Sequence, residues 1–346
     1  MPRPHPARRP ARHDPGSVLG DVTASFHNPG AVRMLSFVPA GLPIGAPLVV
    51  VLHGCTQTAT GYDRGSGWST LAARHGFALL FPEQTHANNP NSCFNWFEAA
   101  DTRRSSGEVA SIANAVTAMV AHHRLDPTRV FVTGLSAGGA MTSALLATYP
   151  DIFAGGAVIA GLPFGAAHGV GEAMQAMSSP AAAAPLLLGD RVRAASTFTG
   201  PWPIVSVWHG DADRTVSVRN GEAVAEQWAD VHAATRDGNA WHNVAGVAVV
   251  ELVTVAGMGH GTPIDGDDGS TAAPFMLDVG IGSSARIAAF WGIATAADTR
   301  ARRPEAVPPR PRPPASAQPK ATAAPAHGFD VGKLINDTLR SVGLMK

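Results

Sequence analysis

Short runs of apolar and β-branched residues alternate along the chain with segments that have helical periodicity. The apolar runs predict buried strands over residues 47–52, 77–81, 129–133, 157–160, 203–208 and 251–255, with Pro82 ending the second. Residues 108–124 carry an apolar stripe at helical spacing, and residues 139–149 have helix-forming composition ended by Pro150. Strands that alternate with helices form parallel sheets. The pattern therefore predicts an α/β protein with a doubly wound, mostly parallel sheet and helices on both faces.

The pattern changes character at both ends of the chain. Residues 1–18 are rich in Pro, Arg and His and are expected to be disordered. After one folded domain over residues 19–295, residues 296–327 form a linker rich in Pro, Ala and Arg. Residues 328–346 place apolar side chains near helical spacing, which predicts a C-terminal amphipathic helix. Its docking partner is either the domain itself, a second protomer or a hydrophobic granule surface.

The pentapeptide Gly-Leu-Ser-Ala-Gly at residues 134–138 lies between a predicted strand and a predicted helix. Strand, sharp turn and helix are the context in which the α/β-hydrolase fold presents its nucleophile. Small residues on either side of Ser136 let the strand and the helix pass closely. We therefore predict the α/β-hydrolase fold, with Ser136 as a catalytic nucleophile.

A serine nucleophile requires a histidine base and a carboxylate, which in this fold follow it in the order acid, then histidine. His260 lies in a Gly-rich loop after the strand at residues 251–255. Asp211 and Asp213 both follow the strand at residues 203–208. We favour Asp213 because the chain has turned further across the end of the sheet, and we expect Asp211 to accept backbone N–H groups within its turn.

An oxyanion hole in this fold uses two backbone N–H groups. One comes from the loop that follows an apolar strand, here His-Gly-Cys after residues 47–52, and the other from the residue after the nucleophile. The predicted donors are Cys55 and Ala137.

Four segments together resemble the polyhydroxybutyrate depolymerase family of esterases, to which feruloyl and acetylxylan esterases are related. They are Leu-His-Gly-Cys-Thr-Gln from residue 52, Cys-Phe-Asn-Trp-Phe from residue 93, the serine motif, and His-Gly-x-x-Asp from residue 209. The resemblance covers about residues 20–295. It implies hydrolysis of polyester or of acyl groups on polysaccharide through an acyl-enzyme. It also implies a disulfide between Cys55 and Cys93, an aromatic substrate contact at Trp96, and an extracellular location.

The residues themselves leave alternatives to these implications. Cys55 and Cys93 are the two cysteines of the chain, and the alternative to a disulfide is two buried free thiols in a reducing compartment. Trp96 has core packing beside Cys93 as its other role. Residues 161–203 lose clear periodicity and form an insertion, whose larger apolar side chains either line the pocket or pack the insertion onto the body. These side chains are Phe164, Met174, Met177 and Phe198.

Composition narrows the function classes. The formal net charge is zero, which favours neither nucleic acid nor an anionic membrane as a partner. Apolar runs are too short for a transmembrane segment, and no cofactor or metal is expected. The first residues lack the apolar stretch of a secretory signal, so a cytoplasmic location is the alternative to an extracellular one.

Taken together, the motifs and the resemblance predict a serine esterase, and we favour a polyhydroxyalkanoate depolymerase. The alternatives are a feruloyl or acetylxylan-type esterase, or a non-catalytic relative that binds a polymer or a protein.

Overall fold

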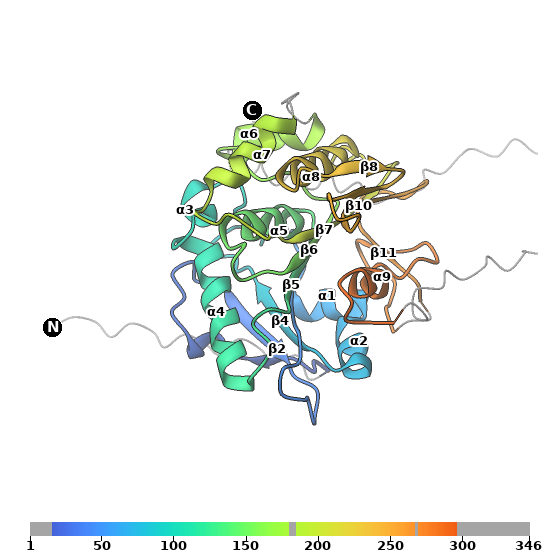
Figure 1. Cartoon of the computed structure of the whole chain (residues 1–346). Coiled ribbons are helices and arrows are strands. Elements are labelled where there is room, and N and C mark those ends of the chain that lie inside the picture. Colours follow the sequence, from blue (N-terminus) through green and yellow to red (C-terminus); the bar gives the residue numbers. More distant parts are fainter. Residues whose placement is uncertain (1–15, 180–184, 267–268, 296–346) are drawn as a thin grey trace, which may run out of the picture.

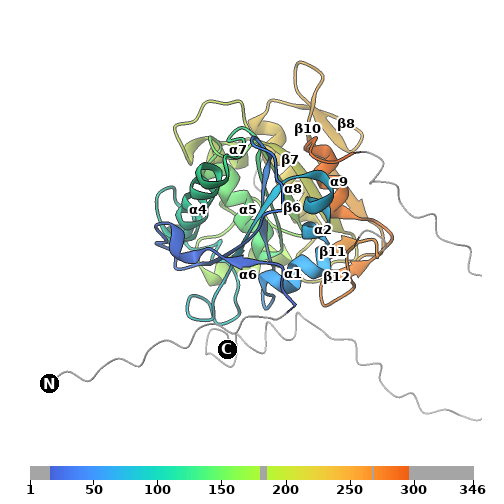
Figure 2. The same ribbon diagram turned by 90° about the horizontal axis from the view of Figure 1, so that it is seen from below.

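A single large sheet runs through the molecule and separates two layers of helices (Figures 1 and 2). The structure, a computed structural model, describes residues 16–179, 185–266 and 269–295. The linker predicted over residues 296–327 and the helix predicted over residues 328–346 lie outside the described residues, as does most of the predicted N-terminal segment. Nearly all of the described chain belongs to the domain predicted over residues 19–295.

Ten strands of the described chain form the main sheet, and its centre is parallel. Their order is β1-β2-β4-β3-β5-β6-β7-β10-β9-β8, and all neighbours from β4 to β10 pair in parallel. The strands at both edges pair antiparallel. The strands are β1 (Gly20–Asp21), β2 (Arg33–Phe37), β3 (Leu48–Leu52), β4 (Ala78–Glu83), β5 (Val130–Leu135), β6 (Gly155–Ile159), β7 (Ile204–Gly210), β8 (Thr235–Asp237), β9 (Ala240–His242) and β10 (Ala248–Val255). Outside this sheet, β11 (Thr262–Ile264) pairs in parallel with β12 (Met276–Asp278).

Helices cover both faces of the sheet, as the alternating pattern predicts. One face carries α4 (Gly107–His123), α5 (Ala137–Thr148) and α8 (Arg219–Val231), and the other carries α1 (Ala59–Ser66), α2 (Trp68–His75) and α9 (Ser283–Phe290) (Figures 1 and 2). The second face is built around Trp68, Phe131 and Trp291, with ring centroids 6.1 Å apart for the two tryptophans and 4.9 Å for Phe131 and Trp291. Each such buried ring contributes roughly 1.5–3 kcal/mol. The architecture is the α/β-hydrolase fold.

One predicted strand end is wrong. β4 does not stop at Phe81 but continues through Pro82 to Glu83. On the β3 side the parallel pairing ends at Leu80, so Pro82 lies beyond that ladder, and on the other side it pairs with Met34 of β2. A proline is tolerated where no ladder needs its missing N–H. The pairing of β4 with β3 therefore ends before Pro82, whereas the pairing with β2 continues past it.

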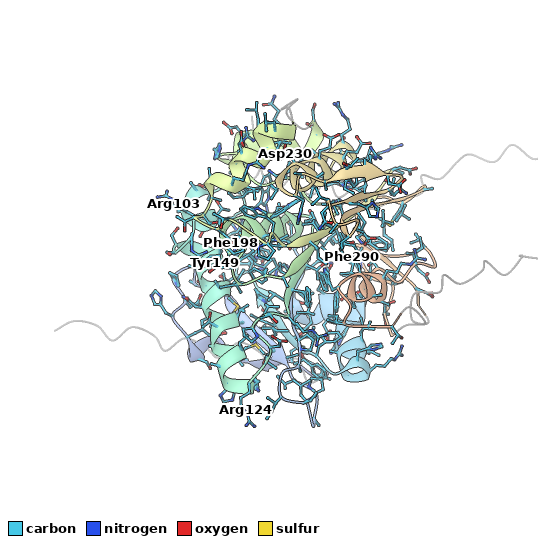
Figure 3. All side chains as sticks on the ribbon, viewed as in Figure 1. Arg103, Arg124, Tyr149, Phe198, Asp230 and Phe290 are labelled. Carbon is cyan, nitrogen blue, oxygen red and sulfur yellow. A yellow bond between two sulfur atoms is a disulfide. The ribbon has the colours of Figure 1, made fainter. Side chains whose placement is uncertain are left out.

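The insertion over residues 161–203 contains two helices that the weak periodicity did not predict. They are α6 (Val170–Ser178) and α7 (Pro185–Ala194); the remaining helical segments are α3 (Ala99–Thr102) and a 3-10 turn at Thr23–Ser25. Helix α7 lies on α8, where Arg193 forms an ion pair with Asp230 at 2.6 Å (Asp230 is labelled in Figure 3). Within the described ranges, no helix combines the length and the apolar character needed to cross a membrane.

Candidate active site

Ser136 occupies the sharp turn between β5 and α5. Its backbone has φ 57° and ψ −117°, and its N–H donates to the carbonyl of Ile159 on β6 at 2.9 Å. A residue with a side chain rarely adopts a positive φ, and such strain persists only where the surrounding structure enforces it. Ser136 is half-buried and lies at the carboxyl ends of the parallel strands, where the loops that carry functional residues gather in such sheets.

The glycines on both sides of Ser136 are required by close backbone contacts. A Cβ atom on Gly138 would lie 2.5 Å from the carbonyl oxygen of His53, and one on Gly134 would lie 2.4 Å from the carbonyl oxygen of Gly138. Both distances are shorter than any real contact of a Cβ atom. The spacing of the pentapeptide therefore follows from the close passage of β3, β5 and α5.

The structure brings His260 and Asp213 together. The two residues follow the neighbouring parallel strands β10 and β7, and Nδ1 of His260 lies 2.7 Å from Oδ2 of the buried Asp213 carboxylate. Oδ1 of Asp213 accepts from the N–H groups of Thr215 and Val216, at 2.8 and 2.9 Å. Burial raises the pKa of Asp213, but hydrogen bonds and the nearby imidazole of His260 hold it well below its usual value. The ionised carboxylate fixes the proton of His260 on Nδ1 and leaves the Nε2 lone pair as a base.

Asp211 has a different partner from Asp213. Its Oδ1 accepts from the N–H of Gly257 at 2.6 Å. The donor was expected within the turn of Asp211 itself, but it lies across the site in the loop that carries His260. Of the two candidate carboxylates, Asp213 is therefore the one that contacts the histidine, and Asp211 fastens the histidine's loop.

A second imidazole, His209, lies beneath Asp213. It is fully buried, its Nε2 lies 2.9 Å from the carbonyl oxygen of Val216, and the same nitrogen is 3.3 Å from Oδ2 of Asp213. The carbonyl can only accept, so the proton is on Nε2 and its positive end also faces the carboxylate. We did not predict this contact. The signal available in the sequence was the His-Gly-x-x-Asp spacing.

The loop after β3 is held in place by several polar contacts and a disulfide. His53 is buried, which lowers its pKa, and its Nε2 accepts from the N–H of Gln84 at 3.0 Å. The proton is therefore on Nδ1, which donates to the carbonyl of Gly54 at 2.7 Å. The predicted disulfide between Cys55 and Cys93 is present. It connects the loop after β3 with the segment that carries Trp96.

A buried carboxyl group accepts hydrogen bonds from the segment that carries Cys93 and Trp96. Glu108, in the first turn of α4, is fully buried and accepts from the N–H of Asn95 at 3.0 Å, from the Asn95 side-chain amide at 2.8 Å and from the Gln84 amide. Burial and the nearby charge of Asp101 raise the pKa of Glu108 to about 8, although these hydrogen bonds favour the ionised form. The loop with Cys93 and Trp96 therefore rests on one titratable group that we did not single out from the sequence.

This group gives a testable pH dependence. Between pH 4.5 and about 8, the folded protein holds a proton on Glu108 that the unfolded chain has released, so the free energy of unfolding falls as pH rises. We expect this loss to be roughly 4–5 kcal/mol at most. Urea unfolding at several pH values measures it. The variant Glu108→Gln should lack that part of the slope, whereas Glu226→Gln, on the exposed surface of α8, should retain it; parallel curves for the wild type and Glu108→Gln would contradict the assignment.

An apolar cluster lies on one side of the site. It includes Ala140 of α5, Leu162 and Val216, with the half-buried Trp96 and Phe97 packed against it. Helix α6 also contributes to this group of side chains, which we call the α6 cluster. The helix is tied to both neighbouring loops, because the N–H of Gly169 donates to the Phe97 carbonyl at 2.8 Å and the N–H of Ser217 donates to the Met177 carbonyl at 2.8 Å.

The side chains noted in the insertion separate into two groups. Met177 packs against the α6 cluster that borders the site, whereas Phe164 packs on the core of the sheet. Phe198 contacts Trp202 with ring centroids 5.4 Å apart, before β7 begins. Trp96 packs on both the sheet core and the α6 cluster. Part of the insertion therefore borders the site, and part only packs against the body.

Comparisons with known proteins agree with this arrangement. Residues 34–245 match the family described as esterase PHB depolymerase. Poly(3-hydroxyalkanoate) depolymerase C from Paucimonas lemoignei is 43% identical over 291 residues, which cover 80% of this chain and 70% of the relative. Acetylxylan esterase A from Aspergillus oryzae is 31% identical over 268 residues, which cover 72% of this chain and 86% of the relative. The solved structure of an acetyl xylan esterase from Aspergillus awamori aligns with a TM-score of 0.67 at 26% identity, covering 80% of this chain and 99% of that one.

Proposed function

Because this chain belongs to the PHB depolymerase family of esterases, we propose that it hydrolyses carboxylic esters through an acyl-enzyme on Ser136, and that its substrate is a polyhydroxyalkanoate. The observation that carries the catalytic part is the 2.7 Å pairing of His260 with Asp213, on strands that follow the strained serine turn in the order this chemistry uses. A serine hydroxyl is a weak nucleophile until an adjacent base accepts its proton.

The proposed reaction has two half-cycles. Nε2 of His260 takes the proton of the Ser136 hydroxyl as its oxygen attacks the ester carbonyl, and Asp213 stabilises the imidazolium that forms. The tetrahedral intermediate collapses when His260 gives the proton to the leaving alcohol, which leaves the acyl group on Ser136. Water then attacks the acyl-enzyme with His260 again as the base. The acid is released and the serine regains its proton.

We assign the oxyanion hole to the main-chain N–H groups of Cys55 and Ala137. Ala137 is the first residue of α5, and the first N–H groups of a helix have no partner within it and carry partial positive charge. Cys55 follows Gly54 at the end of β3, next to β5 in the sheet, and its position is fixed by the disulfide. Each such donor contributes about 3 kcal/mol to the stabilisation of the intermediate.

For the substrate, we favour a polyester over an acylated polysaccharide. The relative with 43% identity is a depolymerase by name, whereas the acetylxylan esterase from Aspergillus oryzae is 31% identical. On one side of the site the half-buried Trp96 and Phe97 pack on the fully buried Leu162 and Val216, and this apolar side suits the aliphatic units of a polyhydroxyalkanoate. An acetylxylan-type esterase is the second candidate, favoured by the alignment that covers 99% of the solved acetyl xylan esterase.

Three substrates offered side by side test the choice: amorphous poly(3-hydroxybutyrate), acetylated xylan and methyl ferulate. The proposal expects the purified protein to clear the polymer suspension and release soluble hydroxyacids. A Trp96→Ala variant should lose polymer clearing more than it loses hydrolysis of p-nitrophenyl butyrate. Release of acetate from xylan without polymer clearing would replace the polyester assignment by the second candidate. Release of ferulate alone would make the protein a feruloyl-type esterase.

A further inference from the structure

Phe275 has a backbone conformation that the catalytic proposal does not use. Its φ is 66°, in the left-handed region that bulky side chains rarely adopt. Its ring is only half-buried against the second apolar core, whereas the adjacent Met276 is fully enclosed. Complete burial of the ring therefore does not explain this conformation. Strained residues held by their surroundings cluster at functional sites.

The ring of Phe275 lies on His260. The two ring centroids are 6.2 Å apart and the planes are nearly perpendicular, at 79°. This edge-to-face arrangement is favourable for aromatic rings. Phe275 therefore contacts the imidazole from the segment between β11 and β12. Trp96 and the α6 cluster belong to a different part of the site, beside α5 and the acid loop.

The backbone around Phe275 is fastened at two points. Its carbonyl accepts from the N–H of Thr262 at 2.7 Å, just beyond His260. The preceding carbonyl, of Pro274, accepts from the side-chain NH₂ of Gln57 at 3.3 Å, and the side-chain oxygen Oε1 of Gln57 accepts from the N–H of Gly54 at 2.8 Å. Gln57 thus joins the segment of Phe275 to the loop after β3. The backbone that carries the ring is therefore tied both to the histidine loop and to the loop to which we assign an oxyanion donor.

This position corresponds to one part of an ester. The histidine delivers its proton to the oxygen of the leaving alcohol, so a side chain beside the histidine is next to the alcohol portion and not the acyl portion. We propose that Phe275 is a specificity residue that contacts the alcohol side of the scissile ester. This inference rests on the proposed esterase mechanism. For a polyester, the alcohol side is the next aliphatic hydroxyacyl unit, whose apolar surface an aromatic ring can cover.

Two ester series distinguish this role from a structural one. The first keeps the butyryl group and varies the alcohol through methanol, butanol and methyl 3-hydroxybutyrate. The second keeps methanol and varies the acyl group from acetyl to octanoyl. In the first series, Phe275→Ala should lower kcat/KM about tenfold for the two larger alcohols and less than about twofold for methanol. In the second series, the variant should keep the acyl-length preference of the wild type.

Deacylation gives an independent measurement, because the alcohol has already left the acyl-enzyme. The rate of deacylation, from burst kinetics with p-nitrophenyl butyrate, should be unchanged in Phe275→Ala.

Two further variants complete the comparison. Phe275→Leu, which retains an apolar side chain, should show a smaller loss of kcat/KM with the same dependence on the alcohol. Phe198→Ala is the matched control. Phe198, which is labelled in Figure 3, packs on Trp202 before β7 begins, at the opposite end of that strand from Asp213.

The results that overturn the proposal are specific. An equal loss for every alcohol, a loss that follows acyl length, or slower deacylation would each show that Phe275 does not act on the alcohol side. Failure of the polyester assignment is recognised separately, because it would leave the polymer intact while both series of small esters are still hydrolysed.

Discussion

Replacing Ser136 by alanine is expected to lower kcat for ester hydrolysis by a factor on the order of 10⁵ or more. The variant removes the only atom that can form the acyl-enzyme we propose, while the turn is still held by its N–H bond to the Ile159 carbonyl. Initial rates with p-nitrophenyl butyrate measure the loss. Labelling with a fluorophosphonate, which reacts with activated serines, should disappear in the same variant.

Ser143→Ala provides a matched control on the same helix. The Ser143 hydroxyl donates to the Leu162 carbonyl at 2.8 Å and is fully buried, so this variant should lose stability by about 1 kcal/mol but keep its activity and its labelling. Substantial activity in Ser136→Ala would contradict the nucleophile assignment. A wild-type protein that neither reacts with the label nor hydrolyses any ester would instead be the non-catalytic, polymer-binding relative.

Replacing Asp213 by asparagine is the second large effect, an expected loss of about 10⁴ in kcat. The amide keeps the shape of the carboxylate but can present an N–H to Nδ1 of His260, which favours the wrong tautomer and leaves Nε2 protonated. The imidazolium also loses its compensating charge. Steady-state kinetics over a range of pH test the assignment, since no pH should restore the wild-type rate.

Asp211→Asn serves as the comparison because it lies two residues away in the same loop. Its carboxylate accepts from the N–H of Gly257, a role that the amide oxygen of asparagine can keep, and the expected loss is less than about tenfold. A large loss in Asp211→Asn together with a small one in Asp213→Asn would reverse the assignment.

Much of this fold can be predicted from the sequence because its signals are local. The central strands are continuous apolar runs buried on both sides, and β3 and β5 lie where such runs predict them. The serine turn is likewise local, since its glycines and its strand and helix all fall within a short stretch. The helices α6 and α7 were missed because Ala and Gly in that region give little periodicity.

The contacts among the site residues are harder to predict because they join segments that are distant along the chain. Position along the loop favours Asp213 over Asp211, but the contact of His260 with Asp213 becomes visible only in the folded structure. The contact of His209 with Asp213 follows from no pattern, since it depends on how the loop turns over the end of the sheet. Glu108 resembles an ordinary acidic residue in the first turn of a helix. Its burial beneath Asn95 becomes visible only when the loop is in place.

The loops after β7 and β10 are joined at more than one point. Besides the contact of His260 with Asp213, the N–H groups of Asp211 and Ala212 donate to the carbonyls of Val255 and Met258, at 3.1 and 3.0 Å. The neighbouring β8–β9 hairpin, in contrast, consists of three-residue strands at the sheet edge, and β8 is exposed throughout. In amide hydrogen exchange we therefore expect the hairpin to open as a separate unit with little protection. The backbone N–H groups of the loops that carry His260 and Asp213 should exchange as slowly as those of the central sheet. Opening of this sheet edge would therefore leave the contact of His260 with Asp213 intact.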